Sequence, residues 1–414
     1  MMPPARRGLD LWLLFIFVLM PPIGVYAALG IAPLLAVGAL GLVALRPGQV
    51  WGWIRGQGVV AAALTAVALL GIASATWSIL PTHSLLEGVR FLTLSISGLL
   101  AVGAVASLEP PHRDRIVHWT AISIAITVAA LAIDMALGLP VLRFAIGASP
   151  DRLIYLERFD RGTTVIGLLF WPIALGLLRA RRIGFLAVLA VATVVALIII
   201  PSSANRLAFA AGGVAALTAI AAPRVVPRLV LIGAMAFGLV LPVAMPHLLP
   251  TNESVVALSD RAPWIKFSGL HRLLIWRFAS ERVAERPLLG WGMDASRELP
   301  GGHTKLTDTL SRAVVPDNAE ALPLHPHNAF LQWWVELGAV GAVLGLAAVA
   351  ALLLRVAALR SRDGLSTATA YAVAALTISL LGYGFWQSWW LSTLWLTGAL
   401  LGSVAADSRQ IRTS

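Results

Sequence analysis

The sequence predicts an all-α polytopic membrane protein with about twelve transmembrane helices and one large, partly helical loop. Its 414 residues are 58% hydrophobic and only 12% charged, and their mean hydropathy is +0.84. Soluble globular domains carry about 25% charged residues, so this chain has too little polar surface to face water. Its apolar residues form long continuous runs, which predict helices, because the strands of a membrane barrel would alternate.

The apolar runs have the length of roughly 17–25 residues that a bilayer core requires. They divide the chain into a first region of nine helices with short loops, 1–248, a loop region, 249–327, and a closing region of three helices and a tail, 328–414. The predicted spans lie near residues 10–27, 29–45, 58–78, 85–107, 115–138, 162–178, 183–200, 205–222, 228–248, 328–355, 366–386 and 388–406.

Arginine residues in alternate loops indicate how the helices are oriented. Cytoplasmic loops of membrane proteins collect Lys and Arg, and here every even-numbered connection is basic, whereas the short loop at 79–84 carries neither residue. Both termini are therefore predicted to be cytoplasmic, with the long loop on the opposite side. The basic residues behind this prediction include Arg46, Arg55, Arg113, Arg115, Arg179, Arg181, Arg182, Arg224, Arg228, Arg355, Arg360 and Arg362.

Two segments on the predicted outer side depart from this rule. Residues 139–161 and 249–327 both hold several Arg residues, although long translocated loops follow the rule only weakly. One interpretation is a solvated surface with local acidic partners. The other, which we favour for the set as a whole, is an outer basic surface for phosphorylated lipid. The outer placement of the basic loop argues against a nucleic-acid partner, despite a net charge of +11.

The long loop is predicted to be partly helical. Ser268 can cap a helix that runs to about Arg286 and ends at Pro287. Within it, Arg277 and Glu281 have the i,i+4 spacing of an ion pair, and its apolar positions favour a place along the membrane interface. Residues 294–324 show no periodicity and are predicted to form an irregular flap.

The stretch from His325 to Gly341 is the strongest candidate for chemistry, because it joins the end of the polar loop to an apolar run. Histidine has an unperturbed pKa of about 6.5 and can exchange a proton near neutral pH. Pro326 disfavours helix for His325, and Asn328 can cap the helix that follows. Either His325 or His327 could therefore act as a base at a boundary between water and membrane.

Arginines near the ends of predicted spans are candidates for binding anionic groups. Arg206 follows the stretch PSSAN at the mouth of the eighth span, where a guanidinium and the free N–H groups of a helix start together suit a phosphate oxygen. Snorkelling of Arg206 to the surface is the alternative. Arg161, before the sixth span, could bind the same group or anchor a helix end. Arg90 has the spacing to pair with Glu87 on one helix face.

Three short motifs stand in a fixed order in the second half of the chain. Arg206 follows a small-residue stretch at a helix mouth, and Arg272-x-x-x-Trp276 is followed by Pro287-Leu288-Leu289-Gly290. His327-Asn328 is then followed by nine residues, Gly338, two further residues and Gly341. With the hydropathy of the whole chain, these motifs resemble those of the O-antigen ligase family and its relatives, the O-antigen polymerases and bacterial protein O-oligosaccharyltransferases.

The resemblance implies a glycosyltransferase C-like enzyme of the bacterial inner membrane with a periplasmic active site. The implied reaction transfers a polysaccharide from an undecaprenyl-pyrophosphate donor to a sugar hydroxyl of lipid A–core. His327 would act as general base, unless His325 does, and Arg206 and Arg272 would stabilise the departing pyrophosphate. Further residues expected to bind the donor or the acceptor are Arg161, His325, Asn328, Arg277 and Arg90.

We expect no cofactor and no catalytic metal. The outer acidic residues form no D-x-D-like pair, and the spacing of His325 and His327 is poor geometry for a zinc ion. Direct displacement would then invert the anomeric centre. A polymerase and a protein O-oligosaccharyltransferase remain open as alternatives, because they use the same kind of donor. A lipid-linked glycan flippase would require ionisable residues near the bilayer midplane, whereas the charges here cluster at span ends and in loops.

Overall fold

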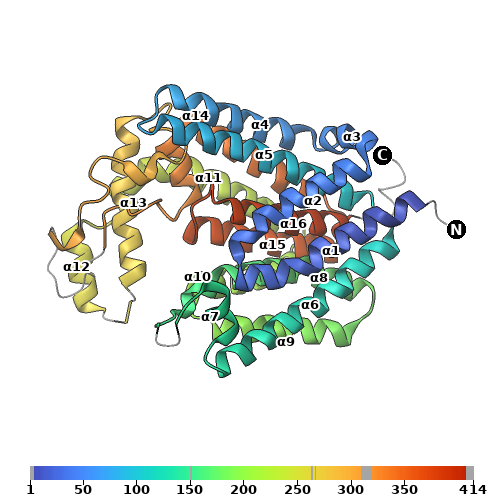
Figure 1. The fold of residues 1–414 in the computed structure, drawn as a ribbon. Coiled ribbons are helices and arrows are strands. Elements are labelled where there is room, and N and C mark those ends of the chain that lie inside the picture. Colours follow the sequence, from blue (N-terminus) through green and yellow to red (C-terminus); the bar gives the residue numbers. More distant parts are fainter. Residues whose placement is uncertain (1–3, 150–151, 263, 266, 309–318, 407–414) are drawn as a thin grey trace.

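The computed structural model describes residues 4–149, 152–262, 264–265, 267–308 and 319–406, and within them all regular structure except one isolated bridge is helical (Figure 1). This confirms the predicted all-α class. Part of the predicted flap, 309–318, lies outside the described residues. The α-helices are α1 Pro4–Tyr26, α2 Ile31–Leu45, α3 Val50–Arg55, α4 Gly58–Ala73, α5 Pro81–Ala106, α6 Pro110–Ala136, α7 Pro140–Ile146, α8 Asp160–Arg179, α9 Ile183–Ile199, α10 Ser203–Ala221, α11 Val226–Leu248, α12 Asn252–Arg261, α13 Phe267–Glu285, α14 Ala329–Ala357, α15 Arg362–Leu381 and α16 Ser388–Ala405.

The protein is a multi-pass membrane protein, and the described residues contain about nine to eleven helices that meet the length and composition of a span, against about twelve expected. Each of the twelve predicted runs contains an α-helix, but among the described residues nine helices are long and apolar enough to cross a membrane. Two shorter apolar segments, Ile183–Ile199 and Val226–Val240, bring the number to eleven. The remaining helix, α16, has 18 residues but combines its leucines with tryptophan, serine and threonine, which lower its hydropathy.

Proline and side-chain caps fix where several helices begin. Pro81 and Pro110 stand in the first turns of α5 and α6, where the missing N–H costs nothing. Asn328 caps α14, because its side-chain oxygen accepts a hydrogen bond from the Leu331 N–H at 3.1 Å. The predicted cap is therefore confirmed. The helix predicted from Ser268 to about Arg286 is present as α13, but it begins at Phe267, so Ser268 lies within its first turn and is not its N-cap.

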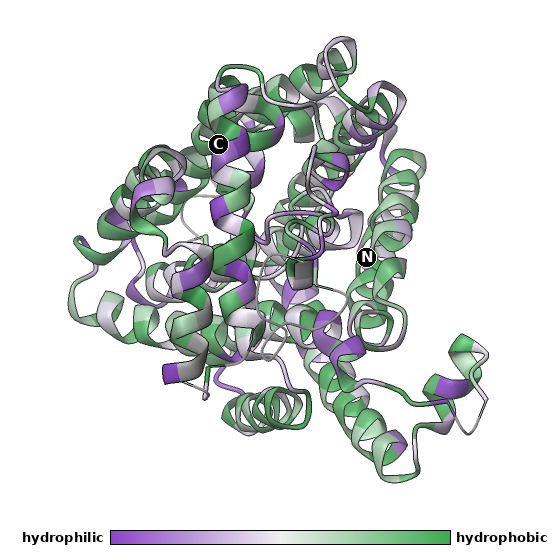
Figure 2. Ribbon diagram, turned by 90° about the vertical axis from the view of Figure 1, so that its left-hand side faces the viewer, coloured by the Kyte–Doolittle hydropathy of each residue, from purple (hydrophilic) through white to green (hydrophobic). Residues whose placement is uncertain are grey.

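The long helices pack into one bundle, and the loop region covers one end of it. In the bundle, α5 packs against α4 and α16, α10 packs against α15, and α11 packs against α14. Helix α13 lies against α11 and α14, whereas α12 contacts α13 and projects from the bundle (Figure 1). Most residues of the long helices are hydrophobic (Figure 2). Many of these residues are exposed, for example Leu40 at 70% and Ile198 at 68%, which is the pattern expected of a surface that faces lipid.

A break in α14 ties the loop region to the bundle. Gly338 has φ 63° and interrupts the helical conformation, which leaves nearby backbone groups without helical partners. The segment 287–292 supplies them: the N–H groups of Trp291 and Gly292 donate to the carbonyls of Val335 and Glu336 at 3.0 and 2.8 Å, and the Ala339 N–H donates to the Pro287 carbonyl at 2.8 Å. The Pro-Leu-Leu-Gly motif and Gly338 are thus two halves of one backbone joint.

Candidate active site around His327

His325 and His327 lie side by side at the start of α14, with ring centroids 4.3 Å apart. His327 adopts the left-handed conformation, φ 52°, which an L-residue rarely occupies without compensating contacts. Two contacts hold this segment. The His327 N–H donates to Nδ1 of His325 at 3.2 Å, and Trp276 of α13 donates its Nε1–H to the Pro326 carbonyl at 2.8 Å. The Trp276 of the sequence motif therefore fixes the histidine segment in place.

The hydrogen bond of His327 sets which ring nitrogen can take up a proton. Its Nδ1 lies 2.5 Å from the Gly382 carbonyl oxygen. A carbonyl can only accept, so Nδ1 carries the hydrogen and Nε2 keeps its lone pair. Among the described residues, Nε2 has no hydrogen-bond partner. Burial, together with the positive charge of Arg272 and the neighbouring His271, lowers the pKa of His327 below its usual value, so the ring is neutral near pH 7.

His325 is arranged differently and cannot serve as a base in this geometry. It is buried, at 9% exposed, and its two ring nitrogens face backbone donors: the His327 N–H and the Gly384 N–H, the latter at 3.1 Å. A neutral imidazole has a single lone pair, so only one of these two contacts can be a hydrogen bond, and that bond occupies the lone pair that a base would need. Burial first, then the charges of His327, Arg297 and Arg272, lower the pKa of His325 to about 3. The geometry thus favours His327 in the choice that the sequence left open.

Arg272 lies on α13 close enough to affect both histidines electrostatically. Its Nη1 donates to the Ser268 carbonyl at 3.1 Å, whereas its buried Nε has no partner among the described residues. Burial lowers the pKa of Arg272, yet a guanidinium stays charged under these conditions. A cation with donor capacity to spare, next to a neutral imidazole, suits a substrate that carries negative charge. The buried amide nitrogen of Asn328 likewise has no partner there.

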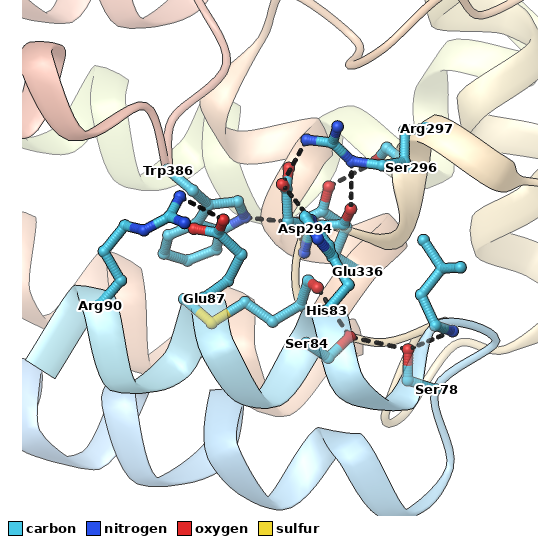
Figure 3. A network of polar contacts seen from close by, with 12 residues as sticks. Ser78, His83, Ser84, Glu87, Arg90, Asp294, Ser296, Arg297, Glu336 and Trp386 are labelled. Carbon is cyan, nitrogen blue, oxygen red and sulfur yellow. Dashed lines mark hydrogen bonds and ion pairs between the residues drawn. The ribbon is translucent and has the colours of Figure 1, made fainter. Parts of the chain in front are cut away.

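A carboxyl group that the sequence analysis missed organises the surroundings of the histidines. Glu336 of α14 is fully buried and accepts hydrogen bonds from the Asp294 N–H at 2.8 Å, Ser296 Oγ at 2.6 Å and Trp386 Nε1 (Figure 3). It also accepts a hydrogen bond from Gln332 Nε2 at 3.0 Å. It therefore joins the loop region, α14 and the 382–387 connection. An ionisable residue inside an apolar run is the signal that could have identified it.

Two further carboxylates form an ion-pair cluster beside Glu336. Asp294 contacts Nε2 of His83 at 2.8 Å and a guanidinium nitrogen of Arg297 at 2.5 Å, and Glu87 pairs with Arg90 at 2.5 Å (Figure 3). The predicted pairing of Glu87 with Arg90 is thereby confirmed.

The ligand atoms of His83, Glu87 and Asp294 lie within 4.8 Å of one another, a spacing that a metal ion could use. Each of the two carboxylates also pairs with an arginine, Glu87 with Arg90 and Asp294 with Arg297. His83 and Asp294 gave no sequence signal, because they come from segments about two hundred residues apart.

Arg206 lies in the first turn of α10, at the mouth of the predicted eighth span, and its guanidinium contacts the end of the preceding helix. Its guanidinium donates to the carbonyls of Leu197, Ile198 and Ile200 at 2.7, 3.2 and 3.1 Å. These are the last carbonyls of α9 and its C-cap, which have no partners within the helix. Neither insertion of Arg206 into a phosphate site nor simple snorkelling describes this contact, and no hydrogen bond or ion pair among the described residues joins Arg206 to His327. The role expected for it stays a prediction.

The 382–387 connection links Arg161 to the histidines. The guanidinium of Arg161 lies 5.5 Å from the ring centroid of Trp389, and Trp389 donates its Nε1–H to Gln387 at 2.8 Å. Gln387 in turn lies 3.4 Å from Nε2 of His325. Arg161 therefore stands on the same side of the bundle as the histidine pair.

Arg277 forms one ion pair and one hydrogen bond with neighbouring residues. It forms the predicted pair with Glu281 at 3.3 Å and donates to the Leu249 carbonyl at 3.2 Å, so it fastens α13 to the end of α11. The structure thus gathers His327, His325, Asn328 and Arg272, connects Arg161 to them through side chains, and gives Arg277 and Arg206 structural contacts elsewhere.

The family description "O-Antigen ligase" matches residues 166–346. This part of the chain, somewhat less than half of its length, is similar to the O-antigen ligase family. This part of the chain contains Arg206, Arg272, His325 and His327, whereas Arg90 and Arg161 precede it. The resemblance seen in the motifs is therefore confirmed.

Three similar proteins from Rickettsia species are named "Putative polysaccharide ligase". The protein of Rickettsia conorii is 28% identical over 242 residues, which is 58% of this chain and 56% of the relative. Those of Rickettsia bellii and Rickettsia prowazekii are 27% and 28% identical over the same length, which is 57% of each relative. The chain thus spans somewhat more than half the length of these relatives.

Proposed function

We propose that the protein is an O-antigen ligase that transfers a polysaccharide from undecaprenyl pyrophosphate to a sugar hydroxyl of lipid A–core, without a metal. The observation that carries the proposal is the state of His327: a neutral imidazole with its Nε2 lone pair unused, next to the cationic Arg272, within the residues that match the family. We further propose that this end of the bundle faces the periplasm of a bacterial inner membrane and that both termini are cytoplasmic.

The proposed step is a direct displacement. The acceptor hydroxyl oxygen attacks the anomeric carbon, the bond from that carbon to the phosphate oxygen breaks, and the pyrophosphate leaves with the electron pair. The hydroxyl proton passes to Nε2 of His327, which is suited to receive it because Nδ1 already donates to Gly382. Attack opposite the leaving group inverts the anomeric centre.

Positive charge next to the imidazole would stabilise the departing lipid pyrophosphate. Arg272 is our first candidate, since its Nε lacks a partner among the described residues and sits in a poorly solvated place, where electrostatic stabilisation is strongest. Arg161, which reaches this side over Trp389, is our second candidate. Arg90, half exposed beside Glu87, is available for phosphates of the acceptor.

Transfer between purified substrates tests the proposal. The full-length protein, lipid-linked polysaccharide and lipid A–core are mixed, and glycosylated lipid A–core is measured for the wild type, His327→Ala, and His303→Ala as the control. His303 is half exposed in the loop region. We expect loss of transfer only in His327→Ala, with donor still bound. Full activity of His327→Ala would refute the assigned base, and longer lipid-linked glycan without modified lipid A–core would identify a polymerase instead.

A further inference from the structure

A large basic hollow lies at the other end of α14 from the histidines. Its volume is about 730 Å³, and it is lined by the connection between α10 and α11 and by the connection between α14 and α15. Helix α14 has 29 residues, so at a rise of about 1.5 Å per residue this hollow lies roughly 40 Å from His327. It is therefore separate from the site proposed for glycosyl transfer.

Four arginines line this hollow: Arg224, Arg228, Arg360 and Arg362. All four are exposed, and none has a hydrogen bond or ion pair with another described residue. The neighbouring acidic residue, Asp363, is already engaged, because it accepts two hydrogen bonds from Arg179 at 2.7 and 3.1 Å. The charge of the four guanidinium groups is thus left uncompensated within the described part of the chain.

Basic residues in loops on one side of a membrane are explained by topology alone when they are scattered. Here they come from two connections far apart in the sequence and meet around one hollow. Two helices also begin at it, α11 at Val226 and α15 at Arg362, and their free N–H groups add to the positive potential. A volume of this size lies within the range of about 300–1,000 Å³ that is usual for ligand sites.

The helix ends that lead into the two connections expose apolar side chains. Leu217 of α10, Leu229 and Ile232 of α11, and Leu354 of α14 are exposed by 70%, 59%, 62% and 57%, respectively. These residues lie in the turns that lead into the two connections. A ligand with a phosphate head and long hydrocarbon chains would place the head between the arginines and the chains along these faces. A soluble anion would contact only the arginines and would leave the apolar faces unused.

We propose that this hollow binds the headgroup of an anionic phospholipid, and specifically one that carries two phosphates, with its acyl chains along α10, α11 and α14. Basic pockets between transmembrane helices bind such headgroups in other membrane proteins. Four guanidinium groups can supply paired donors to two phosphates at once. The inference does not depend on the proposed transfer reaction.

Native mass spectrometry of the full-length protein in detergent tests the assignment. The probes are diphosphatidylglycerol, phosphatidylcholine and inorganic pyrophosphate. The variant is Arg360→Gln/Arg362→Gln, and the control is Arg181→Gln/Arg182→Gln, which removes the same charge from the exposed loop between α8 and α9. We expect the dissociation constant for diphosphatidylglycerol to rise about tenfold or more in the variant and to stay near the wild-type value in the control.

Three results would overturn the proposal. Equal loss in both double variants would show attraction by charge in general, and equal binding by all proteins would place the lipid elsewhere. Displacement of the lipid by equimolar pyrophosphate would assign the hollow to a soluble anion. The residues substituted in the variant and in the control are all exposed, so we expect both proteins to fold. Equal unfolding temperatures of the two proteins and the wild type, without added lipid, would establish this.

Discussion

Replacing Glu336 by glutamine tests the network that holds the histidine segment. Each carboxyl oxygen accepts two hydrogen bonds: Oε1 from Ser296 and Gln332, and Oε2 from Asp294 and Trp386. An amide nitrogen in place of either oxygen would face two hydrogen-bond donors. Because the site is buried, these donors cannot bond to water instead. The Ser296 hydroxyl can rotate to accept, so the better amide orientation leaves one donor without a partner. One unsatisfied buried donor costs about 1–3 kcal/mol, and this is the expected loss in free energy of unfolding.

The measurement compares Glu336→Gln with Glu281→Gln in one detergent. Glu281 is 46% exposed and paired with Arg277, so its replacement should change the free energy of unfolding by less than about 0.5 kcal/mol. Fluorescence of the 15 tryptophans follows unfolding as a denaturing detergent is added. If the two variants unfold at the same point, Glu336 does not hold the loop region to α14 in the way that its hydrogen bonds indicate.

Three further substitutions address the joint and the histidines. Gly338→Ala should destabilise strongly, because φ is 63° and a Cβ would lie 2.3 Å from a backbone atom of Leu288, whereas Gly167→Ala meets nothing within 4 Å; thermal unfolding compares the two. Arg272→Gln should raise the pKa of His327 by removing a charge that lowers it, so the acid limb of transfer against pH should move to higher pH; an unmoved limb would contradict this. His325 has a pKa of about 3 in the fold and 6.5 as its ordinary value. The unfolded chain therefore binds more protons between these values, and stability should fall as the pH drops below about 6.5, by about 3 kcal/mol at about pH 4.5. Denaturation measured at about pH 6.5 and at about pH 4.5 should show a smaller fall in the free energy of unfolding for His325→Gln than for the wild type.

The helices could be predicted from the sequence because lipid imposes one rule on every span. Each long apolar run had to be helical to satisfy its own backbone, and local signals such as Asn328 at the start of α14 fixed the ends. The number of spans was harder to predict. Helix α16 is as long as a span but carries three tryptophans among serine and threonine, so composition alone places it on the borderline.

Contacts within one helix could also be predicted. The pairs of Glu87 with Arg90 and of Arg277 with Glu281 follow from helical spacing, and both are present. The partners of Arg206 could not be derived in this way. Its guanidinium binds the end of the preceding helix, α9, and nothing in the sequence specifies the angle at which α9 and α10 meet.

Contacts between segments far apart in the chain could not be predicted either, because the sequence does not specify how those segments are oriented relative to each other. The segment 287–292 pairs with the broken turn of α14 across more than forty residues of chain, and each half looks ordinary alone: a turn after a proline, and a glycine in an apolar run. The Cβ distances show why both glycines are needed, since a side chain at Gly290 or Gly338 would overlap the backbone of the other half.

The pairing of His327 with His325 has a chemical reason. A cationic imidazole 4.3 Å from His327 would oppose its protonation and weaken it as a base. His325 avoids this, because burial and two backbone donors keep it neutral far below neutral pH. In the tautomer that has its lone pair on Nδ1, His325 also accepts a hydrogen bond from the N–H of His327, whose backbone conformation is strained. One histidine is thus fixed as a neutral support so that the other can titrate.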